Sequence, residues 1–290
     1  MNGSVSKPER PTQDRVIKIF RDELGYSYLG DLQDKADNSN IEATQLSHYL
    51  SRNGYSDLQI NKSLDKLQKT INNHSQGLYN NNKDFYQLLR YGIQVKVDAG
   101  LNTDTVNLID WSSPENNDFY VAEEVTVFGN HQKRPDVVLY INGIAIAVLE
   151  LKNSRVSIAE GIRQSIVNQQ LEFIGSFFST VQFVFAGNDT EGLMYGTTGT
   201  PEKRFLKWKE DIEEDTKNTY QLDKYLKKIC NKKRLIELLY DFVLFDAVSK
   251  SSQGSTSTLE LKPHKNMYEE KKVESFGTRK EVVKALSWFF

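Results

Sequence analysis

The chain has 290 residues, of which 38% are hydrophobic and 26% are charged, and it contains 17 glycines and 6 prolines. This composition excludes a disordered, collagen-like or disulfide-rich protein, and the length suits one large domain or two small ones. Because 37 Lys and Arg residues nearly balance 39 Asp and Glu residues, the net charge of −2 neither indicates nor excludes a nucleic-acid partner.

The sequence shows no pattern typical of a membrane or secreted protein. Its single cysteine, Cys230, excludes an intramolecular disulfide. The N-terminus is polar, and Asn142-Gly143, Glu237 and Asp241 interrupt the most apolar stretches. Because a membrane-spanning helix needs about 20 consecutive apolar residues, we expect a soluble, cytoplasmic protein without a membrane partner.

Residues 1–90 are predicted to form a helical N-terminal region. Apolar side chains recur there at helical spacing in three stretches, and Gly25 and Asn72-Asn73 end the first and the third. The apolar positions are Val16, Ile17, Phe20 and Leu24, then Leu46, Tyr49 and Leu50, then Leu58, Ile60, Leu64, Leu67 and Ile71. We expect these positions to face the core.

From residue 91 the pattern becomes that of an α/β domain, predicted to span residues 91–246. Strands are expected at 93–97, 106–108, 119–127, 136–141, 144–152 and 181–185, with a helix from about Ser157 to Phe173 and a helical region at 202–245. The two strands around Asn142-Gly143 are apolar at odd and even positions alike, so both of their faces should be buried. This predicts that they lie at the centre of a mixed sheet flanked by helices. Residues 247–290 are predicted to form a linker and tail.

Charged side chains stand at neighbouring ends of these two central strands. Arg134-Pro135-Asp136 opens the first strand, and Glu150-Leu151-Lys152 closes the second. Side chains two apart in a strand leave the same face, so Glu150 and Lys152 belong together, and the hairpin returns them to Asp136. Two converging carboxylates suit Mg²⁺, and a lysine beside them could orient or deprotonate water or offset charge on a phosphate.

A plain ion pair is the alternative reading of Glu150 and Lys152. Glu-x-Lys is common on edge strands, where it forms a solvated salt bridge. Here the pair ends a run too apolar for an edge strand, and burying charges without a partner is costly. From the pattern alone, a metal site and a structural ion pair both remain open.

Convergence of the carboxylates also requires a particular hairpin register. A two-residue turn at Asn142-Gly143 would place Asp136 opposite Leu149 and send Glu150 to the other face. We therefore predict a three-residue connection, from Asn142 to Ile144, or an equivalent bulge.

Pro135-Asp136 together with Glu150-Leu-Lys152 resembles the signature of PD-(D/E)xK nucleases. The longer segment 134–152 is similar to the nuclease domain of the restriction subunit of type I restriction–modification enzymes, and the resemblance covers roughly residues 8–246. Further matching stretches are Arg10-Pro-Thr-Gln13, Leu89-Arg-Tyr-Gly92, Asn107-Leu-Ile-Asp-Trp111, Glu160-Gly-Ile-Arg-Gln164 and Ala186-Gly-Asn-Asp-Thr-Glu-Gly192.

The resemblance implies a restriction-endonuclease-like fold and roles for individual residues. Asp136 and Glu150 match the family's metal-binding carboxylates, and Lys152 matches its catalytic lysine. Gln164 matches the glutamine of a Gln-x-x-x-Tyr helix motif that helps position DNA and the active site. Asn168 stands where the family has the tyrosine, which puts that part of the motif in doubt.

The resemblance also implies cleavage of double-stranded DNA by Mg²⁺-dependent phosphodiester hydrolysis. The full-length subunit would act with methylase and specificity subunits and would continue into an ATP-driven motor. No Gly-x-x-x-x-Gly-Lys-Ser/Thr sequence is present, so we do not expect ATP to bind here. The chain is therefore interpreted as the nuclease end of a longer protein, with residues beyond about 247 diverging from the family.

Candidate DNA contacts and rival functions complete the sequence-based hypotheses. The candidate DNA contacts are Arg155, Arg163, Asn168, Lys203 and Arg204, and each basic residue alone also fits a solvated surface charge. One rival function is another PD-(D/E)xK repair nuclease or resolvase. The other is a nuclease-like domain that only binds DNA or docks partners, against which the intact Asp136, Glu150, Lys152 and Gln164 argue.

Overall fold

The computed structural model describes residues 10–35, 37–96, 102–208 and 220–245. Its centre is a seven-stranded mixed sheet in the order β1-β4-β5-β6-β7-β8-β9. β1 pairs with β4, and β6 with β7, in parallel, whereas the other neighbours are antiparallel. The strands are β1 Ser27–Asp31, β4 Phe119–Glu123, β5 Val137–Ile141, β6 Ile144–Leu151, β7 Phe183–Asn188, β8 Gly192–Gly196 and β9 Leu206–Lys207.

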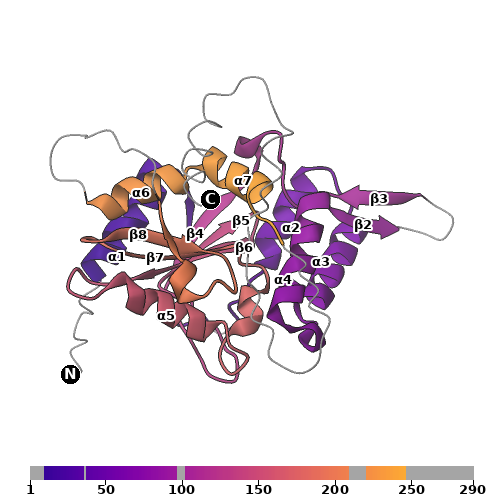
Figure 1. The fold of residues 1–290 in the computed structure, drawn as a ribbon. Helices are drawn as coiled ribbons and strands as arrows, with labels where there is room; N and C mark the ends of the chain where they lie inside the picture. The colour runs from indigo at the N-terminus through magenta and orange to yellow at the C-terminus, as the bar shows by residue number, and fades with distance from the viewer. Residues whose placement is uncertain (1–9, 36, 97–101, 209–219, 246–290) are drawn as a thin grey trace, which may run out of the picture.

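Helices cover both faces of this sheet, so the predicted α/β fold with a restriction-endonuclease-like central sheet is confirmed. In Figure 1, α5 (Ile158–Asn168) lies below the sheet, and α6 (Gln221–Ile229) and α7 (Lys232–Asp241) lie above it. The remaining helices are α1 Arg10–Lys18, extended by a π-helical turn at Ile19–Glu23, α2 Ala43–Arg52, α3 Asp57–Ile71 and α4 Gly77–Tyr91. Short 3-10 turns occur at His74–Gln76, Pro114–Asn116, Gly175–Ser179 and Glu202–Arg204.

The N-terminal region shares its core with the sheet. Val16 on α1, Leu46 on α2 and Leu67 on α3 are fully buried in one hydrophobic cluster with Leu149 and Leu151 of β6. The second cluster, on the opposite face, holds Ile158 and Ile162 of α5 with other buried side chains of the sheet. Burial on both faces places β6 at the centre, as its unbroken apolar run predicted.

Several predicted boundaries are wrong. Residues 1–90 are not wholly helical, because Ser27–Asp31 forms β1 and joins the main sheet beside β4. The strand expected at 119–127 ends at Glu123, since Glu124 has a positive φ of 50°. The helix expected to reach Phe173 ends at Asn168, whose carbonyl accepts from the Ile174 amide as the chain folds back.

Other expected elements differ in kind or position. β7 begins at Phe183 and runs to Asn188, and β8 and β9 were not predicted. Within the described part of 202–245, α-helices occupy only Gln221–Ile229 and Lys232–Asp241. The strand predicted at 93–97 forms a separate two-stranded sheet, β2 Ile93–Lys96 with β3 Thr103–Val106. The division at residue 90 stays a prediction, and the tail 247–290 lies outside the described residues.

The β5–β6 hairpin has a two-residue turn and a bulge. Ile141 pairs with Ile144 across Asn142 and Gly143, whose φ angles of 52° and 82° suit a primed hairpin turn. The register then shifts, because Tyr140 pairs with Ala145 and Leu139 with Ala147. The predicted three-residue connection is therefore wrong, but the alternative of an equivalent bulge is confirmed.

The bulge decides which residues meet at the far end of the hairpin. It adds Ile146 to β6 without a partner on β5, and below it Val137 pairs with Leu149. Continuing this register by one residue places Asp136 opposite Glu150. Directly opposed residues share a face of the sheet, so the bulge brings the two carboxylates to the same side.

Candidate active site

Asp136 and Glu150 form a carboxyl pair at this end of the sheet, in which Glu150 is buried and Asp136 is half-buried. Glu150 is 0% exposed, lies between β5 and β7, and hydrogen-bonds to Asp136. Asp136 Oδ2 also accepts from the Leu151 amide at 2.8 Å. The hydrogen bond between the two side chains shows that the predicted convergence of these residues occurs.

The environment favours the protonated form of this pair. Burial raises the pKa of Asp136, against the opposing effects of the Leu151 amide and the Lys152 ammonium. Burial raises the pKa of Glu150 well above its usual value, and the charge of Asp136 raises it further. A divalent cation would favour both carboxylates in their ionised form, so this donor pair fits Mg²⁺, which proteins commonly bind through one or two carboxylates.

Helix α5 places two amide side chains against Glu150. Ser157 caps the helix by accepting from the Ala159 amide at 3.3 Å. Gln164 Nε2 donates to Glu150 Oε2 at 2.7 Å, while its Oε1 accepts from Lys152 Nζ at 2.9 Å. Gln164 therefore bridges the lysine and the carboxyl pair, and the structure brings Asp136, Glu150, Lys152 and Gln164 into one hydrogen-bonded chain.

Asn168 also belongs to this chain. It lies one turn after Gln164 and donates from Nδ2 to Glu150 Oε1 at 3.3 Å. Its side chain is 1% exposed, and its Oδ1 is buried without a hydrogen-bond partner. A buried amide cannot reach a duplex outside the protein, so the predicted direct DNA contact does not fit, and Asn168 instead holds Glu150.

Gly161 lets α5 approach the strand that carries the site. A Cβ at this position would lie 3.3 Å from Ala186 Cβ and 3.5 Å from both Glu150 Cβ and Lys152 Cγ. A larger side chain would push the helix away and lengthen the Gln164 hydrogen bonds. Residue 161 appeared in the motif Glu160–Gln164, but its close packing against β6 was not predicted.

A second missed contributor is the ion pair of Glu124 and Arg134. Glu124 is buried, and its carboxylate accepts from Arg134 Nε at 2.6 Å. The Glu124 amide donates to the Asp136 carbonyl at 2.9 Å, and its charge raises the pKa of both Asp136 and Glu150. The adjacent acidic residues 123 and 124 in an apolar strand were the sequence signal for this pair.

The other candidate DNA contacts lie beside α5. Arg155 is exposed in the connection from β6 to α5. Arg163 is exposed on the helix and forms an ion pair of 2.7 Å with Glu202, which begins the short helix that carries Lys203 and Arg204. These residues surround one helix, so they remain candidate DNA contacts, whereas Asn168 does not.

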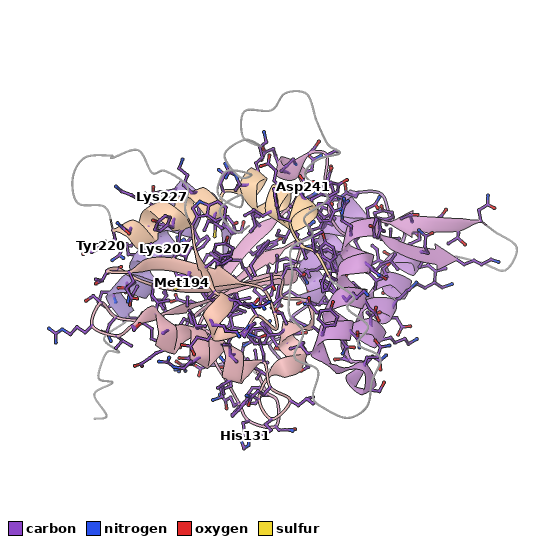
Figure 2. The ribbon with its side chains drawn as sticks, in the orientation of Figure 1. His131, Met194, Lys207, Tyr220, Lys227 and Asp241 are labelled. Carbon is purple, nitrogen blue, oxygen red and sulfur yellow. The ribbon has the colours of Figure 1, made fainter. Side chains whose placement is uncertain are left out.

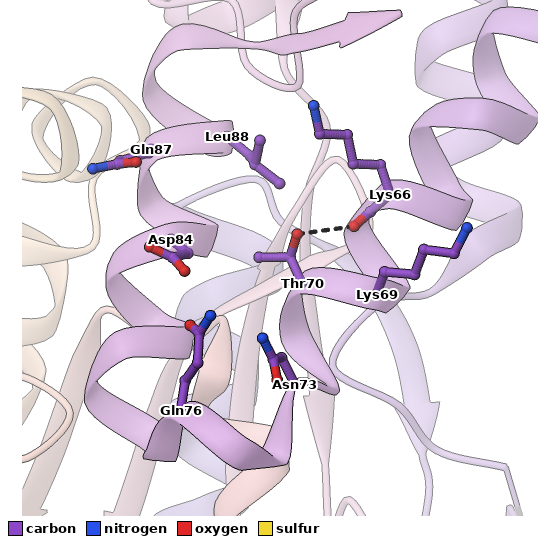
Figure 3. Close-up of a pocket in the computed structure, with 8 residues that line it drawn as sticks. All are labelled: Lys66, Lys69, Thr70, Asn73, Gln76, Asp84, Gln87 and Leu88. Carbon is purple, nitrogen blue, oxygen red and sulfur yellow. Dashed lines mark hydrogen bonds between the residues drawn. The ribbon is translucent and has the colours of Figure 1, made fainter.

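Two other polar regions lie apart from the carboxyl pair. His131 stands at the lower edge of the molecule (Figure 2), with its ring centroid 5.6 Å from that of Phe173. A hollow of about 340 Å³ between α3 and α4 is lined in part by Lys66 and Lys69 (Figure 3). Neither region includes a predicted site residue. Within the described ranges, no group of three or more His, Cys, Asp and Glu residues suits a metal ion.

The comparisons with known proteins decide the family. The family model described as type I restriction enzyme R protein N terminus matches residues 7–203, which is more than half of the chain. The chain belongs to this family. The resemblance seen in the sequence to the restriction subunit of type I enzymes is therefore confirmed.

Curated relatives carry matching names. The type I restriction enzyme MjaVIIIP endonuclease subunit of Methanocaldococcus jannaschii is 29% identical over 232 residues, covering 73% of this chain and 22% of that protein. The MjaIXP endonuclease subunit of the same organism is 26% identical over 206 residues, with coverages of 62% and 20%. The HindI endonuclease subunit of Haemophilus influenzae is 24% identical over 190 residues, with coverages of 60% and 17%. The chain thus spans about a fifth of the length of these relatives.

No helix within the described ranges combines the length and apolar character needed to cross a bilayer.

Proposed function

We propose that this chain is the endonuclease portion of a type I restriction enzyme and cleaves double-stranded DNA by Mg²⁺-dependent phosphodiester hydrolysis. The observation that carries the proposal is the chain of contacts from Lys152 through Gln164 to Glu150 and Asp136. Membership of the R protein N-terminus family supports it. The site also follows the PD-(D/E)xK pattern, with Glu150 buried and with Asp136 and Lys152 half-buried.

Asp136 and Glu150 would hold the metal. When bound, Mg²⁺ would polarise the scissile phosphodiester and lower the pKa of an attacking water. The two carboxyl groups lie at the end of a sheet buried on both faces, so packing limits their movement. The Leu151 amide fixes Asp136, and the amides of Gln164 and Asn168 fix Glu150.

Lys152 would act on the water or on the phosphate. Its ammonium group donates to Gln164 Oε1 and to the Leu151 carbonyl, which hold it near Asp136 and Glu150. From there it can orient the attacking water and offset negative charge that develops on the phosphate. Gln164 is neutral, so it positions Lys152 without cancelling the charge that this role requires.

DNA would approach along α5. Arg155, Arg163, Lys203 and Arg204 would contact backbone phosphates, which set the position of a duplex but carry no sequence information. We assign recognition of the target sequence to methylase and specificity subunits, and ATP-driven movement to a motor elsewhere in the full-length subunit.

Plasmid cleavage tests the proposal. Supercoiled plasmid is incubated with the 290-residue chain in Mg²⁺ or EDTA, and calorimetry measures Mg²⁺ binding. We expect cleavage only with Mg²⁺, and loss of cleavage in Lys152→Ala and Asp136→Asn. Lys69→Ala is the control, because Lys69 is exposed on α3, where it pairs with Asp65.

Three outcomes would contradict the proposal. Cleavage in EDTA would exclude the metal mechanism, and equal activity of Lys152→Ala and Lys69→Ala would exclude the site. DNA binding without Mg²⁺ binding or cleavage would favour the rival function, a nuclease-like docking domain.

A further inference from the structure

We propose that the turn from Asn188 to Glu191, between β7 and β8, positions α5 and thereby sets where Gln164 stands relative to Lys152. Asn188 and Glu191 are positioning residues in this view, because their side chains hydrogen-bond to Val156 and Ile158 at the start of α5. The inference rests on the proposed function for its catalytic consequence. The turn belongs to the motif 186–192, which carries no role in the chemistry above.

Asn188 is the centre of this turn. Its side chain is 1% exposed, and Nδ2 donates to the Val156 carbonyl at 2.8 Å and to Glu191 Oε1 at 3.1 Å. Its Oδ1 accepts from the amides of Thr190 at 3.1 Å and Glu191 at 2.6 Å. All four hydrogen bonds available to the amide are thus made, which fixes the turn against the connection between β6 and α5.

Glu191 links the turn to the first residue of α5. Its Oε1 accepts from the Ile158 amide at 2.9 Å, one of the amides at a helix N-terminus that lack a partner within the helix. Ser157 already caps the helix from the position just before it, so Glu191 supplies a second cap from the turn between β7 and β8. A carboxylate is also favoured there by the helix dipole.

The turn therefore holds the whole segment between Lys152 and α5. Thr190 Oγ1 donates to the Ser154 carbonyl at 3.2 Å, and the Lys152 amide donates to the Gly187 carbonyl at 2.9 Å. Contacts from the turn and from Gly187, which precedes it on β7, thus begin at Lys152 and end at Ile158. Gln164 lies six residues further along a rigid helix, about 9 Å at 1.5 Å per residue, so a shift at Ile158 moves Gln164.

The turn is fixed from the opposite side as well. Asp189 accepts from Thr12 Oγ1 at 3.2 Å and forms an ion pair with Arg15, both on α1. Arg15 also pairs with Asp223 on α6 at 3.1 Å. These contacts anchor the turn to helices on the far face of the sheet, so it serves as a fixed point for α5.

The test compares Glu191→Ala and Asn188→Ala with the conservative Glu191→Gln in the full 290-residue chain. Hydrogen exchange of the backbone amides is the first readout, and the rate of Mg²⁺-dependent plasmid cleavage at saturating DNA is the second. We expect faster exchange across 158–164 and about tenfold slower cleavage in the alanine variants, the low end of effects seen when groups that orient metal ligands are removed. Glu191→Gln should restore both, because its amide oxygen can still accept from Ile158.

Asn231→Ala is the matched control. Asn231 caps α7 by accepting from the Lys233 and Arg234 amides, and α7 lies on the other side of the sheet from α5 (Figure 1). It should lower the thermal midpoint as Glu191→Ala does, but leave cleavage and exchange in α5 unchanged. If Glu191→Ala behaves like Asn231→Ala in all three measurements, the positioning role is excluded.

Failure of the two proposals can be told apart. If the unmodified chain does not cleave DNA, the proposed function fails, and exchange across 158–164 still decides whether the turn holds α5. If Asn188→Ala does not fold, the comparison of Glu191→Ala with Glu191→Gln still tests the positioning role. Glu191 is exposed, so we expect both of these variants to fold.

Discussion

The β5–β6 hairpin buries a polar side chain at each end, and the two side chains differ in charge and in hydrogen bonding. At the turn, Asn142 is 0% exposed, and its amide donates to the Leu108 carbonyl and Asn117 Oδ1 while accepting from the Asp118 amide. At the other end, Glu150 is equally buried, but it faces a second carboxyl group, and its pKa is raised well above the usual value.

The turn end of the hairpin therefore contributes to stability, and the opposite end contributes to the proposed function. A neutral amide with satisfied hydrogen bonds stabilises the fold. A buried carboxylate beside another carboxylate destabilises the ionised protein until a cation or a proton is bound. The turn end therefore fixes the register, and the opposite end holds groups whose ionised state suits a metal ion.

The largest effect is expected from breaking the turn end. Asn142→Ala would remove three hydrogen bonds, at about 1 kcal/mol each, and would add about 1 kcal/mol because alanine tolerates a positive φ less well than asparagine. Denaturant titration should therefore show about 4 kcal/mol lower stability. Asn142→Gly should recover only the backbone part, and equal losses in both variants would contradict this division.

Removing the Gln164 side chain, which links Lys152 to Glu150, should lower the rate of DNA cleavage and leave stability nearly unchanged. Gln164→Ala removes the link between Lys152 and Glu150, and we expect plasmid cleavage to fall about 100-fold, or ~2.7 kcal/mol in the barrier. The thermal midpoint should barely change, because the side chain is half-buried. Gln169→Ala, on the residue that caps the same helix and contacts Gly199, is the control. Full activity of Gln164→Ala would remove Gln164 from the site.

The pH dependence of stability measures the ionisation of Glu150, the titratable group at the site end of the hairpin. A raised folded pKa means that Glu150 keeps its proton where the unfolded chain has lost it, so metal-free stability falls as pH rises above about 4.5 until Glu150 ionises. Glu150→Gln lacks this loss and should be about 1–2 kcal/mol more stable than the parent at pH 8 without metal.

Added Mg²⁺ should reverse that order. The parent chain should gain thermal stability with Mg²⁺ at pH 8, because the metal replaces the proton on the carboxyl pair, whereas Glu150→Gln should gain little. Thermal scans with EDTA or Mg²⁺ at several pH values check both statements. Equal Mg²⁺ stabilisation in the two proteins would argue against Glu150 as a ligand.

The smallest effect is expected where α5 packs on β6. Gly161→Ala improves helix propensity by about 1 kcal/mol but places its Cβ 3.3 Å from Ala186, so the two terms nearly cancel in stability. The helix must move by a few tenths of an ångström, and cleavage should fall several-fold. Gly161→Val should lose far more stability and far more cleavage activity, and comparing the two variants shows whether helix position controls the cleavage rate.

Much of the site followed from local pattern. Strand alternation put Glu150 and Lys152 on one face, and an apolar run at both parities put β6 at the sheet centre, as the structure has it. The helix start near Ser157 followed from helical periodicity, and the family resemblance singled out Gln164 on that helix. These features depend on residues close together in the chain, where side-chain chemistry and backbone geometry act directly.

What the sequence left open depends on residues far apart in the chain. β1 pairs with β4 across about ninety residues, and no local pattern in 27–31 specifies that partner. The position of the bulge, at Ile146, falls in an apolar run where every register buries similar side chains, so only the fit of the whole sheet selects it. The burial of Asn168 and the contacts of Asn188 and Glu191 with α5 depend on how helices pack on the assembled sheet. The sequence by itself determined the chemical groups and their faces, and the tertiary structure decided their distances, because packing between distant segments sets them.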